Sequence, residues 1–164
     1  MHRHSRLIIT TGVSAVLLLA GAASVWAHSD ANAPSATTDV GPYTITLKVL
    51  PAETFSGSHA AMSWDGGAQP VEVGGDAGPN HHMVIFVERD GTPVENAQID
   101  MRYRKADSDQ KSSWRNLPVA RMHARGEGRQ TTHFGNNLTL PAGRYEVRVD
   151  IEGQSTTMDV TVPS

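Results

Sequence analysis

The 164-residue sequence contains no cysteine, which excludes a zinc–thiolate site, a redox CxxC motif, a disulfide framework and a lipid-bearing lipoprotein cysteine. Aromatic residues make up only 5% of the chain, whereas glycine (15) and proline (9) are frequent. This balance favours short strands and turns over long helices. The sequence also lacks the GxSxG, HExxH, P-loop and dinucleotide-binding motifs. We therefore expect a protein that is not an enzyme.

The first 27 residues are predicted to be a secretory signal peptide. Arg3 and Arg6 give a basic start, an apolar run follows from Leu7 to Ala23, and Val25-Trp26-Ala27 is a small-residue cleavage site. The run is short for the alternative, an uncleaved membrane anchor. Cleavage leaves 12 of the 14 basic residues against all 17 acidic ones, a net charge of −5 with neutral histidines. A periplasmic or secreted protein that does not bind nucleic acid is expected.

After the leader, residues 28–42 are polar and small, and we expect a flexible linker there. Residues 43–164 are expected to form one domain. In the segment 43–49 apolar and polar residues alternate, which predicts a half-buried strand. The segment 83–88 is apolar on both faces, which predicts a central strand. Residues 52–80 are rich in glycine, and only the segment 71–73 is expected to form a short strand there.

The rest of the chain consists of short alternating segments separated by turn signals. The segment 114–123 contains Pro118 and is predicted to be an edge or bulged strand. About seven strands at this spacing, with no helical period, predict an all-β, immunoglobulin-like antiparallel β-sandwich. No internal repeat is visible, which argues against a propeller or a solenoid.

Histidine and methionine gather at the ends of the predicted strands. His81-His82-Met83 opens the central strand, Met122-His123 closes another, and His133 opens the next. In an antiparallel arrangement the end of one strand and the start of the next fall at the same end of a sheet. Imidazole and thioether without thiolate is a ligand set for copper, and imidazole also binds iron, nickel and zinc. We therefore expect a metal site formed by His82, Met122 and His133, with His81 or His123 as a fourth ligand.

Each of these residues also has an ordinary structural interpretation. Met83 and Met122 are the size and polarity of core residues, and Met158 shares a face with two valines and is expected in the core. His81 is equally compatible with a solvated loop, and His123, which lies between Arg121 and Arg125, with an exposed strand edge.

Two motifs resemble a known family. Leu117-Pro118-Val119-Ala120-Arg121-Met122 followed by His133-Phe134-Gly135-Asn136-Asn137 is similar to the periplasmic proteins of high-affinity iron uptake. The resemblance covers residues 80–152 and implies an immunoglobulin-like, copper-binding homodimer that works beside an inner-membrane metal permease. It implies that His82, Met122 and His133 are metal ligands, for copper alone or together with iron.

The chain departs from that family's pattern at several points, and the departures bear more on iron than on copper. Val84 and Ile85 stand where a carboxylate is expected, no histidine follows Tyr145, and the loop between Met122 and His133 is longer and basic. The chain is also similar, more loosely, to YtkA-like and FixH-like exported domains, through the segments 90–94 and 143–147.

Two alternatives remain open. Cleavage after Ala27 would make His28 the first residue, and a terminal amine with its own imidazole and a second histidine forms a copper brace, as in the CopC-like carriers that this start resembles. Alternatively, the histidines are incidental and the protein is an exported interaction or accessory domain. Its contact surface would then be the loop from Ala52 to Pro79, which carries Met62 and Trp64.

Overall fold

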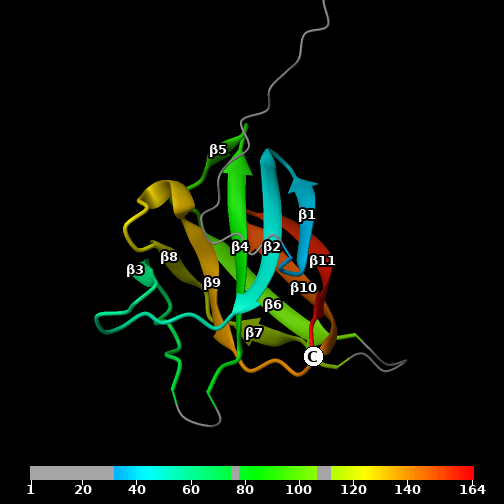
Figure 1. The fold of residues 1–164 in the computed structure, drawn as a ribbon. Coiled ribbons are helices and arrows are strands. Elements are labelled where there is room, and N and C mark those ends of the chain that lie inside the picture. Colours follow the sequence, from blue (N-terminus) through cyan, green and yellow to red (C-terminus); the bar gives the residue numbers. More distant parts are fainter. Residues whose placement is uncertain (1–31, 75–77, 107–111) are drawn as a thin grey trace, which may run out of the picture.

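The computed structural model describes residues 32–74, 78–106 and 112–164. They form two antiparallel sheets packed as a β-sandwich, which confirms the predicted all-β fold (Figure 1). The predicted signal peptide and His28 lie outside the described residues. No helix in the described ranges is long and apolar enough to cross a membrane.

The larger sheet has seven strands in the order β1-β2-β4-β9-β8-β3, with β5 paired to β4. Its strands are β1 (Ser35–Val40), β2 (Tyr43–Pro51), β3 (Met62–Gly67), β4 (His81–Arg89), β5 (Thr92–Pro93), β8 (Ala120–Ala124) and β9 (His133–Leu138). A short 3₁₀ turn, η1 (Arg129–Thr131), leads into β9. The smaller sheet has the order β11-β10-β6-β7. It contains β6 (Ile99–Lys105), β7 (Arg115–Leu117), β10 (Gly143–Ile151) and β11 (Gln154–Val162).

The main core lies between the two sheets. Alternate residues of each strand point into it, as the period-2 pattern predicts: Ile45, Leu47 and Val49 of β2 are all buried. Met83 and Met158 belong to this core, in agreement with their ordinary structural interpretation. β4 lies between β2 and β9, and the prediction of a central strand is confirmed.

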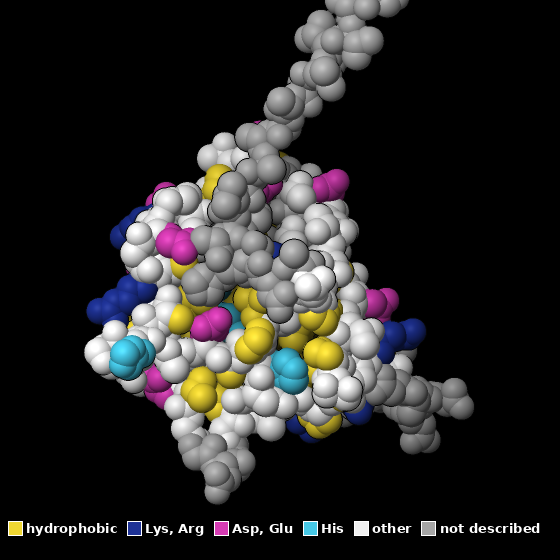
Figure 2. Space-filling view, in the orientation of Figure 1, with side chains coloured by type: hydrophobic (Ala, Val, Ile, Leu, Met, Phe, Trp, Pro, Cys, Tyr) yellow, Lys and Arg dark blue, Asp and Glu magenta, His cyan; other side chains and the backbone are white. Residues whose placement is uncertain are grey.

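A second, smaller apolar cluster lies on the outer face of the larger sheet. It explains why β4 is apolar on both faces. This outer cluster contains Leu50, Val84, Phe86, Ala120 and Met122, with Ala33 and Phe55 packed against it. In Figure 2 hydrophobic side chains and histidines gather on the face of the molecule that carries β2, β4 and β9. The larger sheet therefore buries side chains on both of its faces in this region.

Strand positions differ from the sequence expectation in three places. The expected linker contains β1, which pairs along its whole length with β2. In the irregular segment 52–80 the strand that forms is β3, and residues 71–73, which were expected to form a strand, do not. The backbone N–H and carbonyl of Val71 form hydrogen bonds with the side chains of Asn136 and Asn137 instead of with a neighbouring strand. The single strand predicted over 114–123 is two strands in different sheets, and Pro118, which has no N–H for a ladder, lies at the crossing. The described residues form eleven strands, whereas about seven were expected.

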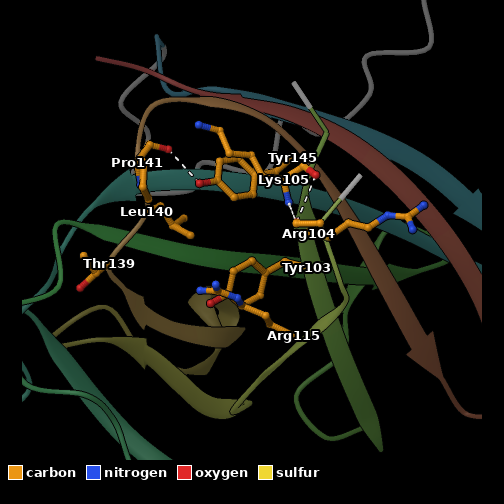
Figure 3. A pocket seen from close by; sticks show the side chains of 9 residues that line it. Tyr103, Arg104, Lys105, Arg115, Thr139, Leu140, Pro141 and Tyr145 are labelled. Atoms are coloured by element: carbon orange, nitrogen blue, oxygen red, sulfur yellow. Dashed lines mark hydrogen bonds between the residues drawn. The ribbon is translucent and has the colours of Figure 1, made fainter. Parts of the chain in front are cut away.

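A tyrosine fixes the start of β10. The Tyr145 hydroxyl donates a hydrogen bond to the backbone carbonyl of Pro141, 2.9 Å away and four residues earlier. Figure 3 shows this contact beside a hollow lined by Tyr103, Lys105, Arg115 and Leu140. A hydroxyl that ties a strand start to the preceding corner is a feature of immunoglobulin-type sandwiches. We therefore interpret Tyr145 as a structural residue.

Candidate metal centre

The three residues predicted as ligands lie together on the outer face of the larger sheet. His82 is on β4, His133 on β9 and Met122 on β8, and these are adjacent strands. Met122 is directly opposite His133 in the strand pairing, so their Cβ atoms are about 5 Å apart. His82 shares this face with Val84 and Phe86 of the outer cluster because side chains alternate along a strand. All three side chains are buried, with exposed fractions of 0% for His82 and Met122 and 2% for His133.

The two imidazole rings lie against each other. The centroids of the His82 and His133 rings are 5.6 Å apart and their planes are perpendicular. Between them on β9 is Gly135, which is paired with Val84. Gly135 has φ +154°, and a Cβ there would stand 2.1 Å from the backbone oxygen of Met83. Glycine is therefore required at this position, and no side chain separates the two rings on that strand.

Hydrogen bonds fix which nitrogen of each ring carries the proton. Nδ1 of His133 is 2.8 Å from the backbone oxygen of Thr131, and a carbonyl can only accept, so this Nδ1 donates. Nδ1 of His82 is 2.9 Å from Oδ1 of Asn137. The Asn137 amide is oriented by its Nδ2, which donates to the backbone oxygens of Glu53 and Val71, each at 2.7 Å. Oδ1 therefore faces His82 and accepts a hydrogen bond from its Nδ1–H.

In both neutral rings the lone pair consequently lies on Nε2, and both Nε2 atoms are buried. A metal-binding histidine commonly donates its other nitrogen to a carbonyl or carboxylate, which fixes the tautomer and the ring orientation. The surroundings of His82 and His133 give both rings this arrangement. Nε2 is thus the nitrogen of each ring whose lone pair could bind a cation.

The ring separation fits a shared ion. A metal–imidazole bond is about 2.0 Å long and the ring centre lies roughly 1 Å behind the nitrogen, so two imidazoles on one ion have ring centres at most roughly 6 Å apart. The observed 5.6 Å is within this limit. Two imidazole nitrogens, with the thioether of the methionine paired to His133 on the neighbouring strand, are donors that suit copper.

The site is covered by a loop and apolar side chains. The Phe55 ring lies 5.9 Å from the His82 ring between centroids, and the Phe86 ring lies 5.3 Å from that of His133. Leu50 is paired with His82 on the neighbouring strand β2. The backbone N–H of Glu53 donates to Oδ1 of Asn137 at 3.1 Å, so the loop that carries Phe55 is tied to the strand that carries His133. Water is thereby largely kept from the two rings.

The structure does not bring His81 and His123 to the same place. His81 precedes His82 on β4 and therefore points to the opposite face, where it lines a separate hollow of about 300 Å³ with Val49 and Pro163. Partial burial lowers the pKa of His81. His123 follows Met122 on β8 and also points away, and its Nδ1 lies 2.6 Å from Oδ2 of Asp65. Within the described ranges, no three histidine, aspartate, glutamate or cysteine side chains form a metal-binding group.

Several residues that build this site were not predicted as functional. Asn137 and Phe55 are the main ones, and Asn136 joins the same network: it is buried, accepts from the N–H of Val71, and donates to Gln69 and Pro118. Two adjacent asparagines inside a strand between apolar segments are unusual, because buried amides need several partners. That pair is a signal in the sequence. No comparable signal in the sequence marks Phe55, because only the path of its loop brings the ring to His82.

The segment from Ala52 to Pro79, the alternative contact surface, contains both exposed and buried side chains. Trp64 is 52% exposed, whereas Met62 is buried at 2%. The Trp64 indole N–H donates to the backbone oxygen of Gly66, which holds the ring at the edge strand β3.

No known family model, curated protein or solved structure matches this chain.

Proposed function

We propose that this protein is an exported, non-enzymatic copper-binding protein of the periplasm that holds one copper ion through Nε2 of His82, Nε2 of His133 and the thioether of Met122. It would serve metal uptake or handling, and an inner-membrane metal permease is its proposed partner. Copper fits the donor set better than iron does, because one of the three proposed ligands is a thioether, and thioether sulfur favours copper.

One observation carries this proposal. Two buried imidazoles stand 5.6 Å apart and each donates its Nδ1 proton to a protein oxygen. A histidine in an apolar core needs one such bond, but two adjacent rings in the same tautomer, with a methionine opposite, point to a shared cation.

A metal titration tests the proposal. We expect the purified protein to bind one equivalent of copper, and the double variant His82→Ala/His133→Ala to lose at least about a hundredfold in affinity, since removing even a supporting partner of a ligand costs 10- to 100-fold. The variants His59→Ala and His123→Ala are matched controls, because His59 is exposed and His123 faces Asp65. Unchanged affinity in the double variant would remove the site.

The exposed Trp64 favours a second candidate function, an interaction domain that docks a partner at the edge of the larger sheet. This candidate predicts that the wild-type protein gains no thermal stability from copper, because only a ligand that binds the folded state raises the melting temperature. Under the copper proposal, Tm rises with added copper in the wild type and in Trp64→Ala alike.

A further inference from the structure

We propose that the protein binds a small organic carboxylate at a second site, in a hollow beside the guanidinium of Arg121. The hollow has a volume of about 310 Å³. It lies on the inner side of the larger sheet, because Arg121 precedes Met122 of the outer cluster on β8 and side chains alternate along a strand. The site is therefore separate from the candidate metal centre, and the proposal does not depend on copper binding.

The lining of the hollow is mainly apolar. Phe134 of β9 is paired with Arg121 and belongs to the main core. Ala97, Ile99 and Val119 add further apolar surface beside it. Ligand pockets range from about 300 to 1,000 Å³ and combine an apolar lining with a few polar groups that orient the ligand. This hollow is at the lower end of that range, so it fits a small ligand with an apolar part.

The guanidinium of Arg121 is the charged group of the lining. Its Nη1 donates a hydrogen bond to Oδ1 of Asn96 at 2.6 Å, and its Nη2 donates to the backbone oxygen of Asp65 at 2.7 Å. Nε is buried and has no hydrogen-bond partner in the part of the chain that the structure describes. A guanidinium carries five N–H groups, so each terminal nitrogen keeps a second N–H. Arg121 is thus held in place by two neutral acceptors that leave its charge uncompensated.

The carboxylates nearest to the hollow are bound to other groups. These contacts join Asp65 Oδ2 to His123 Nδ1 at 2.6 Å, Glu152 Oε1 to the backbone N–H of Gln98 at 2.7 Å, and Glu95 Oε2 to Nη1 of Arg129 at 4.0 Å. Within residues 32–74, 78–106 and 112–164, Arg121 forms no ion pair. A partly buried cation without an anion is costly, and the guanidinium fork matches the two oxygens of a carboxylate. A ligand carboxylate would supply the missing charge.

Benzoate is a suitable probe because it joins one carboxylate to one apolar ring. Benzamide has the same shape without the charge, and acetate has the charge without the ring. The purified protein is titrated with each at pH 7, and NMR shifts of the backbone amides around the hollow and of the Arg121 Nε–H report binding. We expect benzoate to bind at one site with a dissociation constant of about 1 mM or below. It should bind at least about tenfold more tightly than benzamide or acetate.

Removal of the guanidinium tests its role. Arg121→Gln is expected to weaken benzoate binding by about tenfold or more, because a hydrogen bond to a charged group is lost together with the charge. Arg125→Gln is the matched control. Its guanidinium is exposed, lies just beyond β8 and donates to the backbone oxygen of Gly57, so the same change in net charge should leave benzoate affinity unchanged.

A built-in carboxylate tests the same idea without removing Arg121. Asn96→Asp keeps the size of the side chain and places a carboxylate where the amide oxygen now accepts from Nη1. We expect benzoate affinity to fall by about tenfold or more while stability does not fall, since the new carboxylate compensates the guanidinium. Asn96→Ala removes the same amide without adding a charge and should lose less benzoate affinity than Asn96→Asp.

Several results would overturn the proposal. It fails if benzoate does not bind, or if benzoate binds equally to the wild type and to Arg121→Gln. Equal binding of benzamide would show that charge is not recognised, and equal binding of acetate that the apolar lining has no part; either refutes the ligand class. An equal loss in Arg125→Gln would assign the effect to the general field of the protein. If Arg121→Gln does not fold, unchanged benzoate affinity in Asn96→Asp refutes the site.

Discussion

Asn137 offers the most specific test of how the fold prepares this centre. Its side chain forms four hydrogen bonds: it accepts from Nδ1 of His82 at 2.9 Å and from the N–H of Glu53 at 3.1 Å, and it donates to the backbone oxygens of Glu53 and Val71 at 2.7 Å. Replacement by alanine removes all four at a position that is 1% exposed. We expect lower stability and, separately, weaker metal binding.

The magnitudes follow from these contacts. At about 1 kcal/mol net per hydrogen bond, four bonds correspond to about 4 kcal/mol of unfolding free energy, reduced to about 3 kcal/mol where the loop relaxes onto water. For a domain of this size such a loss lowers Tm by roughly 10 °C. Loss of the acceptor for the His82 proton also frees the tautomer and the ring orientation, and second-shell changes of this kind cost 10- to 100-fold in metal affinity.

The neighbouring residue provides a matched control. Asn136 is 0% exposed and its side chain also forms four hydrogen bonds, with Gln69, Pro118 and the N–H groups of Val71 and Asn137, but none of them reaches a ligand. Asn136→Ala is expected to lose similar stability with little change in metal affinity. Denaturant unfolding of the metal-free protein and chelator competition for Cu(I) measure the two effects. Equal copper affinity in the two variants would refute the positioning role of Asn137.

Three further predictions concern the frame around the site. Gly135→Ala places a Cβ 2.1 Å from the backbone oxygen of Met83. We therefore expect the free energy of unfolding to fall by about 3 kcal/mol or more and the β4–β9 pairing to weaken, which faster amide hydrogen exchange in β9 would show. Amide protection equal to that of the wild type would contradict this prediction. Tyr145→Phe removes the bond to Pro141 and is expected to cost about 1 kcal/mol in denaturant unfolding without changing copper affinity. The hydrogen bond from Arg148 lowers the pKa of Asp150, so the stability contributed by this carboxylate is present above its ordinary value of 3.8 and is lost as pH falls through its lowered pKa. Arg148→Gln should therefore flatten the acid limb of a stability–pH profile, whereas an unchanged slope would rule out this contribution.

The fold class could be predicted because a half-buried strand has a sequence in which apolar and polar residues alternate. The alternation in β2 and the continuous apolar run of β4 need only a period of two and a buried sheet, and both were confirmed. Strand β3 could not be predicted, since its segment is broken by glycines and becomes a strand only through pairing with β8. The crossing of the chain between sheets at Pro118 likewise depends on which neighbours are available.

The sequence by itself determined that imidazole and thioether groups stand where strands begin and end, and that no thiolate competes with them. Only the tertiary structure decided which of them share a face. His82, His133 and Met122 lie on the outer side of three adjacent strands, while His81 and His123, one residue away, point elsewhere. The reason is that alternation assigns each residue to one of two faces, but the identity of a strand's neighbours, and the loop that covers them, arise from contacts distant in the chain.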